Sequence, residues 1–192
     1  MTNPPLPEGH GEPLSALRGV VGSRMVAVRY LLSSGAQWPD VRVVGSVHEV
    51  DHGVELVMAD GSVLALHWEM QEYDEFLAIA PMSVAGSLGP EGLIDALSVS
   101  AAPEWVGILG RTITGVGVAW HIPNAGCPRS VWAARIDLDG GSSFVIALGE
   151  IQEGAPTYHP TSIVILFDQA VAASYRIPAS TTSAWGETVP TS

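Results

Sequence analysis

The chain has 192 residues, of which 47% are hydrophobic and 15% are charged. This length suits one domain or two small ones, and the composition argues against a disordered chain. The formal net charge of −12 argues against a basic nucleic-acid-binding surface and against docking on an anionic membrane. It favours attraction to a basic protein partner.

The compartment is predicted from cysteine usage and from the absence of targeting signals. Cys127 is the single cysteine, so no intrachain disulfide can form. The N-terminus has no basic and apolar signal-peptide pattern, and no apolar run approaches the roughly 18 residues that span a bilayer. We therefore expect a soluble cytoplasmic protein.

In chain order, the first expected elements are a flexible tail, a helical turn and a set of strands. Residues 1–13 hold four prolines and are predicted to be a flexible tail, followed by a single helical turn over 13–19. Apolar residues then recur with a period of two in 26–30 and 64–68, which is typical of strands with one buried face. Glycine-containing turns at 51–53 and 60–62 predict hairpins.

The stretch His48-Glu49-Val50-Asp51-His52 matches the zinc-protease pattern H-E-x-x-H. Metal binding by this pattern needs a helix, in which the two histidines lie about 6 Å apart along the axis. In a strand they are about 13 Å apart. The flanking β-branched, alternating residues favour a hairpin over a helix. An alternative remains open, in which His48, His52 and His67 form a metal site of a hydrolase with Glu49 as the base.

Acidic and aromatic residues interleave in the first half, and the pattern suits a surface that receives a basic protein. A loop tryptophan, Trp38, is predicted either to anchor an interface or to fold over the core. The predicted partner surface comprises Trp38, Glu49, Asp51, Glu55, Glu69, Glu72, Tyr73, Asp74 and Glu75.

The most informative feature of the chain is an internal repeat, in which similar short motifs occur in the same order in both halves. The motif E-x-Q-E occurs at 69–72 and again at 150–153, and each copy is followed by an apolar strand-like run. We interpret this as a duplication, with repeats over 14–80 and 102–168 joined by a short helical linker at 89–100. The predicted fold is α+β and mostly antiparallel β, with two pseudo-symmetric β-meanders and few short helices.

The end of the chain is predicted to hold a turn, a helix and a second tail. A glycine turn at 139–142 predicts a hairpin, and 168–176 is expected to be a helix capped by Asp168. Residues 178–192 are small and polar apart from Trp185, so they are predicted to be flexible.

Little in the sequence indicates catalysis. There is no serine elbow, phosphate loop or dinucleotide fingerprint, and Cys127 lies in a loop without an evident activating base. We therefore predict a non-enzymatic interaction protein without cofactors. Small acidic proteins of this kind are similar in type to bacterial immunity proteins and antitoxins.

Two other functions remain open beside the interaction module. The first is the metal-dependent hydrolase described above. The second is a small-molecule-binding protein with a pocket between the repeats, lined by Trp68 and Trp120. The sequence predicts neither the identity of a partner nor the oligomeric state.

Overall fold

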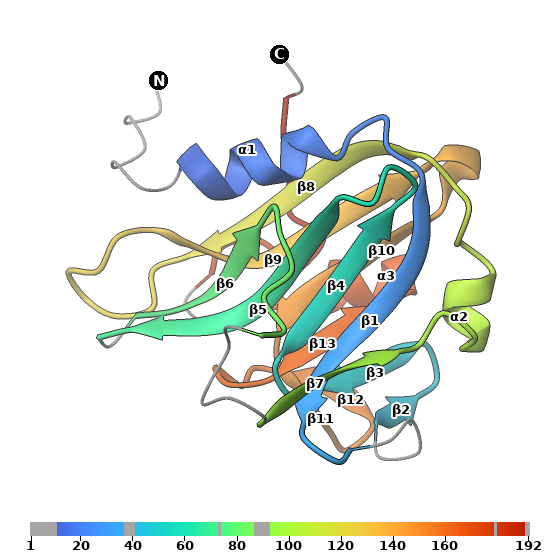
Figure 1. The fold of residues 1–192 in the computed structure, drawn as a ribbon. Helices are drawn as coiled ribbons and strands as arrows, with labels where there is room; N and C mark the ends of the chain where they lie inside the picture. The colour runs from blue at the N-terminus through green and yellow to red at the C-terminus, as the bar shows by residue number, and fades with distance from the viewer. Residues whose placement is uncertain (1–10, 37–40, 73, 87–92, 179, 191–192) are drawn as a thin grey trace.

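The computed structural model describes residues 11–36, 41–72, 74–86, 93–178 and 180–190 (Figure 1). The strands of the first sheet are β1 (Met25–Ser33), β4 (Gly53–Met58), β5 (Val63–Gln71), β6 (Asp74–Ala80) and β7 (Ile94–Ser98). Those of the second sheet are β2 (Arg42–Val44), β3 (Val47–Val50), β8 (Ile113–His121), β9 (Ser130–Leu138), β10 (Ser143–Leu148), β13 (Ile163–Leu166) and β14 (Glu187–Thr188). A small separate hairpin pairs β11 (Glu150–Gln152) with β12 (Ala155–Thr157).

The two large sheets are antiparallel and lie in two layers over a shared core (Figure 1). The strand order is β6-β5-β4-β1-β7 in the first sheet and β14-β8-β9-β10-β13-β3-β2 in the second. In each sheet, four neighbouring strands occur in chain order, β1-β4-β5-β6 in one and β8-β9-β10-β13 in the other. Strands β2 and β3 intervene between β1 and β4, and the β11–β12 hairpin intervenes between β10 and β13. The predicted architecture, mostly antiparallel β with few short helices, is confirmed.

The core between the sheets is apolar and rich in aromatic side chains. Trp105 and Trp132 are fully buried. The Trp105 ring packs edge-on against Phe144 and Phe167, with ring centroids 5.0 and 4.8 Å away. Such offset aromatic pairs add about 1 kcal/mol each beyond the burial of their surface.

In the part of the chain that the structure describes, three α-helices accompany the sheets: α1 (Gly11–Gly19), α2 (Pro103–Val106) and α3 (Gln169–Ser174). Helix α1 contacts β6 and β8 and buries Leu14 and Leu17, which lie three residues apart on one face. Val20, directly after the helix, is buried as well. With nine residues, α1 is longer than the predicted single turn. Helix α3 is confirmed, and its predicted cap Asp168 accepts hydrogen bonds from the two main-chain N–H groups of residues 170 and 171. None of the helices in the described ranges has the length and apolarity needed to cross a membrane.

The predicted hairpin at 51–53 is wrong. Strand β3 pairs with β2 and β13 in the second sheet, whereas β4 pairs with β1 and β5 in the first. Asp51 and His52 therefore carry the chain from one sheet to the other. The predicted turn at 60–62 does join β4 to β5, and a 3-10 turn at Asp139–Gly141 joins β9 to β10 as expected.

The predicted helical linker is also wrong where the structure describes it. Ile94–Ser98 form strand β7, which pairs with β1 at the edge of the first sheet, and residues 89–92 lie outside the described ranges. The strand forms because β1 offers an unpaired edge, and this long-range pairing overrides a weak local helix preference.

Residues 180–190 pack on the second sheet, although a flexible tail is predicted there. Strand β14 pairs with β8, and Ala184 is buried. The guanidinium of the buried Arg135 donates to the Trp185 carbonyl at 2.8 Å and to the Thr188 hydroxyl at 3.0 Å. It also lies 4.7 Å from the centre of the Trp185 ring. The buried Arg135 thus adds to the strand pairing that holds this segment on the sheet.

Candidate functional site: an acidic end of the sandwich

The strand register brings several connections to one end of the sandwich. Pairings near this end are Ser33 with Ile94, Leu31 with Gly53 and Gln71 with Asp74 in the first sheet, and His121 with Ser130 and Leu148 with Ile163 in the second. Both sets lie at the same end because two residues join Val50 to Gly53. The ring of His121 also contacts the Glu75 main chain from the other sheet.

Carboxylates are concentrated at this end, which we call the acidic end. They are Asp51, Glu69, Glu72, Asp74, Glu75, Asp95, Glu150 and Glu153. Four ion pairs occur among the described residues, and none of them involves these carboxylates. Like charges that are not paired add to one another, so this end projects a negative potential into solvent.

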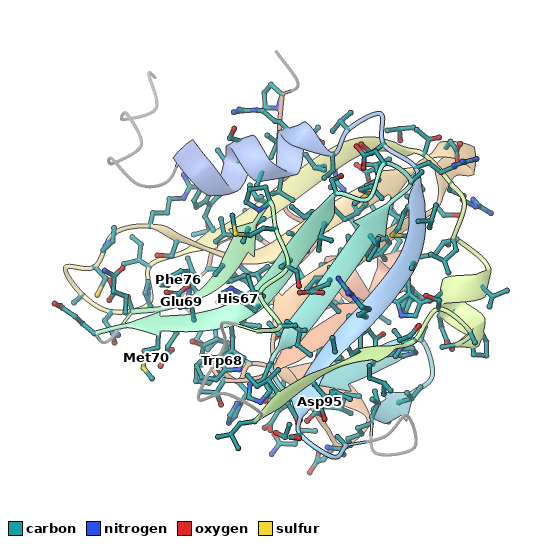
Figure 2. The ribbon with its side chains drawn as sticks, viewed as in Figure 1. His67, Trp68, Glu69, Met70, Phe76 and Asp95 are labelled. Carbon is teal, nitrogen blue, oxygen red and sulfur yellow. The ribbon has the colours of Figure 1, made fainter. Side chains whose placement is uncertain are left out.

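The β5–β6 hairpin carries half of these carboxylates (Figure 2). Side chains alternate along β5, so His67 and Glu69 lie on one side of the strand, and Trp68 and Met70 on the other. Phe76 is the register partner of Glu69. Met70 is 51% exposed, which places an apolar side chain among acidic ones. Such a mixture of apolar and acidic side chains is suited to a protein interface.

Both E-x-Q-E motifs end in the same unusual backbone conformation. Glu72 and Glu153 have φ values of 59° and 50°, and they are the non-glycine residues with positive φ in the described part of the chain. Each directly follows a paired residue at the end of a tight hairpin, Gln71 paired with Asp74 or Gln152 paired with Ala155. Such tight turns need the left-handed conformation, which costs a residue with a Cβ about 1 kcal/mol. Both turns therefore hold an exposed carboxylate where glycine would be less strained.

The base of the β5–β6 hairpin is fixed to the second half of the chain. The Tyr158 hydroxyl donates to the Glu75 carboxylate at 2.7 Å, and His121 Nε2–H donates to the Glu75 carbonyl oxygen at 2.9 Å. Burial, together with the hydrogen bond to Glu75, raises the pKa of Tyr158 above its ordinary value. Burial lowers the pKa of His121, so its ring is neutral near pH 7. Two hydrogen bonds therefore hold the base of the hairpin against the second half of the chain.

Glu55 does not belong to the surface where the sequence analysis places it. Its side chain is fully buried, with one oxygen 2.7 Å from the Arg29 guanidinium. The other oxygen accepts hydrogen bonds from the Ser83 hydroxyl and from the N–H groups of Val84 and Ala85. Glu55 therefore clamps residues 81–86 onto the outer face of the first sheet.

The other predicted partner residues are divided between structural and exposed positions. Glu49 is half-buried, accepts from the Ile151 N–H at 2.7 Å and lies 3.6 Å from Arg42. Its main contribution is therefore to anchor β11. Asp51, Glu69 and Glu72 are exposed at the acidic end, where Asp74 and Glu75 are half-buried. Trp38 and Tyr73 lie outside the described residues.

His48 lies in the interior and belongs to a buried hydrogen-bonded chain. Its Nδ1 is 2.7 Å from the Tyr30 hydroxyl, which accepts from Trp105 Nε1 at 2.8 Å and therefore donates to His48. Its Nε2 is 3.2 Å from the Glu104 carboxylate. Burial lowers the pKa of His48 and raises that of Tyr30. A neutral imidazole and a phenol that resists ionisation join the two sheets to α2, and they do not form a reactive pair.

The two histidines of the H-E-x-x-H stretch occupy different surroundings. His52 is half-buried at the acidic end and stacks on Trp68 at 6.4 Å between ring centroids. His67 lies near His52 and Glu55, on the outer face of the first sheet. Within the described ranges, no group of three or more His, Cys, Asp or Glu side chains is arranged to hold a metal ion. The strand predicted through His48 and Glu49 is confirmed as β3, and it separates the imidazoles that a zinc site would need together.

Two nucleophile candidates at this end lack the geometry for catalysis. Ser33 Oγ is 3.2 Å from the Asp51 carboxylate and 3.3 Å from His52 Nε2. The serine proton goes to Asp51, so His52 must act as a donor toward Ser33, which reverses the order of a catalytic triad. A hydrogen bond to Asp74 raises the pKa of the Cys127 thiol, which disfavours the reactive thiolate.

The tryptophans predicted to line a pocket between the halves are engaged elsewhere. Trp68 is half-buried, packs on the core and donates from Nε1 to the Asp51 carbonyl at 2.9 Å. Trp120 is 8% exposed, and the Arg129 guanidinium lies 5.0 Å from its ring centre.

The fold and this end define a two-sheet antiparallel β protein that exposes a carboxylate-rich surface. Comparison with protein-family models, curated proteins and solved structures gives no match to this chain.

Proposed function

We propose that this protein is a non-enzymatic interaction module that presents its acidic end to a basic protein partner. The observation that carries the proposal is the set of carboxylates on and around the β5–β6 hairpin that form no ion pair within the described part of the chain. Their summed field would speed the encounter with a basic surface, and Met70 and Phe76 would supply apolar contact. A cytoplasmic role of the immunity or antitoxin type fits this chemistry.

We also propose that the two halves, residues 14–80 and 102–168, arose by duplication. Support comes from the shared chain order of β1-β4-β5-β6 and β8-β9-β10-β13. Further support comes from the two E-x-Q-E hairpins, which share a left-handed glutamate. A duplication would account for two glutamates displayed on equivalent turns of one interaction surface.

The test compares two variants of equal charge change. In the hairpin variant, Glu69→Lys and Glu72→Lys replace exposed residues of the acidic end. In the control variant, Asp139→Lys and Glu187→Lys replace exposed residues away from that end. Each protein is immobilised to capture binding proteins at low salt, and the dissociation constant of each purified candidate is then measured at several salt concentrations.

The proposal predicts a basic partner whose affinity falls at least tenfold for the hairpin variant and little for the control. Raising the salt concentration should weaken wild-type binding, because it screens the acidic end. Equal effects of the two variants, or partners that bind independently of both, would contradict the proposal.

A further inference from the structure

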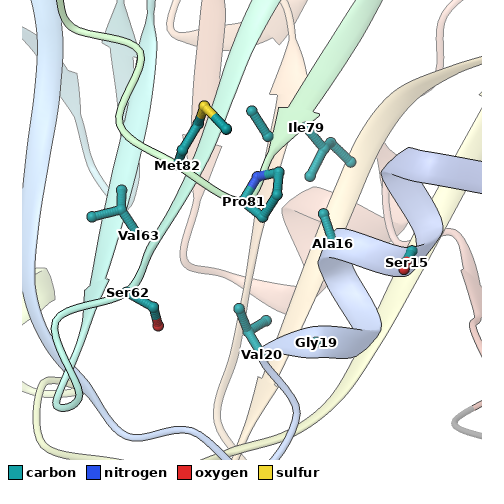
Figure 3. A pocket seen from close by; sticks show the side chains of 10 residues that line it. Ser15, Ala16, Gly19, Val20, Ser62, Val63, Ile79, Pro81 and Met82 are labelled. Atoms are coloured by element: carbon teal, nitrogen blue, oxygen red, sulfur yellow. The ribbon is translucent and has the colours of Figure 1, made fainter.

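A pocket of about 550 Å³ lies between α1 and the ends of β5 and β6 (Figure 3). It is lined by Ser15, Ala16, Gly19, Val20, Ser62, Val63, Ile79, Ala80, Pro81 and Met82. Val63 and Ala80 occupy strand ends opposite to the acidic end. This pocket is therefore separate from the proposed partner surface.

The lining of this pocket is apolar and uncharged. Its polar side chains are the hydroxyls of Ser15 and Ser62, and the second of these donates to Asp60 at 2.7 Å. Ser62 therefore offers an acceptor lone pair at the rim. A volume of 300 to 1,000 Å³, an apolar lining and a few polar groups are typical of small-ligand sites.

We propose that this pocket binds a small, uncharged and largely apolar molecule. A charged ligand would lose hydration without gaining a counter-charge, because none of the lining residues is ionisable. Anions are disfavoured further by the net charge of −12. An apolar ligand gains about 25 cal/mol for each Å² that it buries against this lining.

Both walls of the pocket are held by contacts with the body of the protein. Pro81 and Met82 form one wall, and they belong to the segment 81–86 that Glu55 clamps to the sheet. Val84 in that segment is buried against Leu31 and Ala65. Helix α1 forms the other wall and is held by buried Leu17. A preformed site loses little conformational freedom on binding, which favours affinity.

The wall residue Met82 provides a sharp variant with a matched control. Met82 is 63% exposed, so Met82→Asp leaves the core intact while placing an unpaired carboxylate at the pocket. Val106→Asp replaces another exposed apolar residue, 61% exposed on α2, and changes the net charge equally. It touches neither the pocket nor the acidic end.

The probe is the neutral apolar dye N-phenyl-1-naphthylamine, titrated by fluorescence into each full-length protein. We expect saturable one-to-one binding to the wild type and to Val106→Asp, and at least tenfold weaker binding to Met82→Asp. The Glu69→Lys and Glu72→Lys variant should bind the dye like the wild type, which separates this proposal from the partner proposal.

Two outcomes would overturn the proposal. One is the absence of saturable binding to the wild type, or equal binding to Met82→Asp. The other is a wild-type dimer in sedimentation analysis that Met82→Asp dissociates, because a second copy of the chain would then occupy the pocket.

Discussion

His67 should make the protein lose stability in mild acid. The side chain is 5% exposed on the outer face of the first sheet, between its register partners Gly53 and Ala78. Burial is the main cause that lowers its pKa from 6.5 to about 4, and the charge of nearby Glu55 only partly opposes this effect. The folded state therefore favours the neutral ring.

The size of the effect follows from linkage between proton binding and folding. Between pH 6.5 and about 4, the unfolded chain binds a proton at His67 and the folded chain does not. The contribution of neutral His67 to the free energy of unfolding is complete above pH 6.5 and is lost as the pH falls toward 4. At about 1.4 kcal/mol per pKa unit, the loss between pH 7.5 and 4 is about 3 kcal/mol. The total free energy of unfolding of a typical domain is only about 5–15 kcal/mol.

The assay is urea unfolding of the wild type and of His67→Gln at pH 7.5 and pH 4. Each protein is compared with itself, so the packing change in the variant cancels. We expect His67→Gln to lose about 3 kcal/mol less than the wild type over this range. A difference below about 1 kcal/mol would refute the reasoning, as would an NMR titration midpoint of the His67 ring near its ordinary value of about 6.5.

Three other substitutions test the remaining contacts. Glu55→Gln should destabilise the fold by about 3 kcal/mol, because the Arg29 charge loses its partner, and should speed hydrogen exchange at the Val84 amide. Tyr30→Phe should cost about 2 to 4 kcal/mol in thermal or urea unfolding, because it removes the donor to His48 and the acceptor of the Trp105 indole. Glu72→Gly should raise the free energy of unfolding by about 1 kcal/mol by relieving the left-handed turn, while weakening partner binding.

The period-two pattern at 26–30 and 64–68 predicted β1 and β5 correctly, because burial alternates where one face of a strand meets the core. It failed where both faces are covered. Glu55 occupies a position of β4 where the alternation predicts an exposed polar side chain. The segment 81–86 nevertheless covers it on the outer face of the sheet. No local pattern in the sequence signals that cover, because it depends on a contact across about thirty residues.

A local sequence pattern was equally unable to predict which strands pair with one another. The glycine turn beside Asp51 and His52 looks the same whether the next strand folds back or crosses to another sheet. Arg135 reads as a surface charge in the sequence, whereas it is 5% exposed and fastens residues 180–190. Charged residues are rarely buried without partners. Here one partner is the nearby carboxylate of Asp137, 2.9 Å away. The others are a main-chain carbonyl and a hydroxyl about fifty residues further along the chain.

The acidic end was predicted only in part, and the missing part strengthens the functional argument. The sequence shows the dense run around Glu72, but the register adds Asp95 and the second hairpin with Glu153. Left-handed glutamates recur at both turns, where glycine would cost less. Backbone strain at two exposed turns of the same end does not stabilise the fold. A contact between these two carboxylates and a partner would explain why glutamate occupies both strained positions.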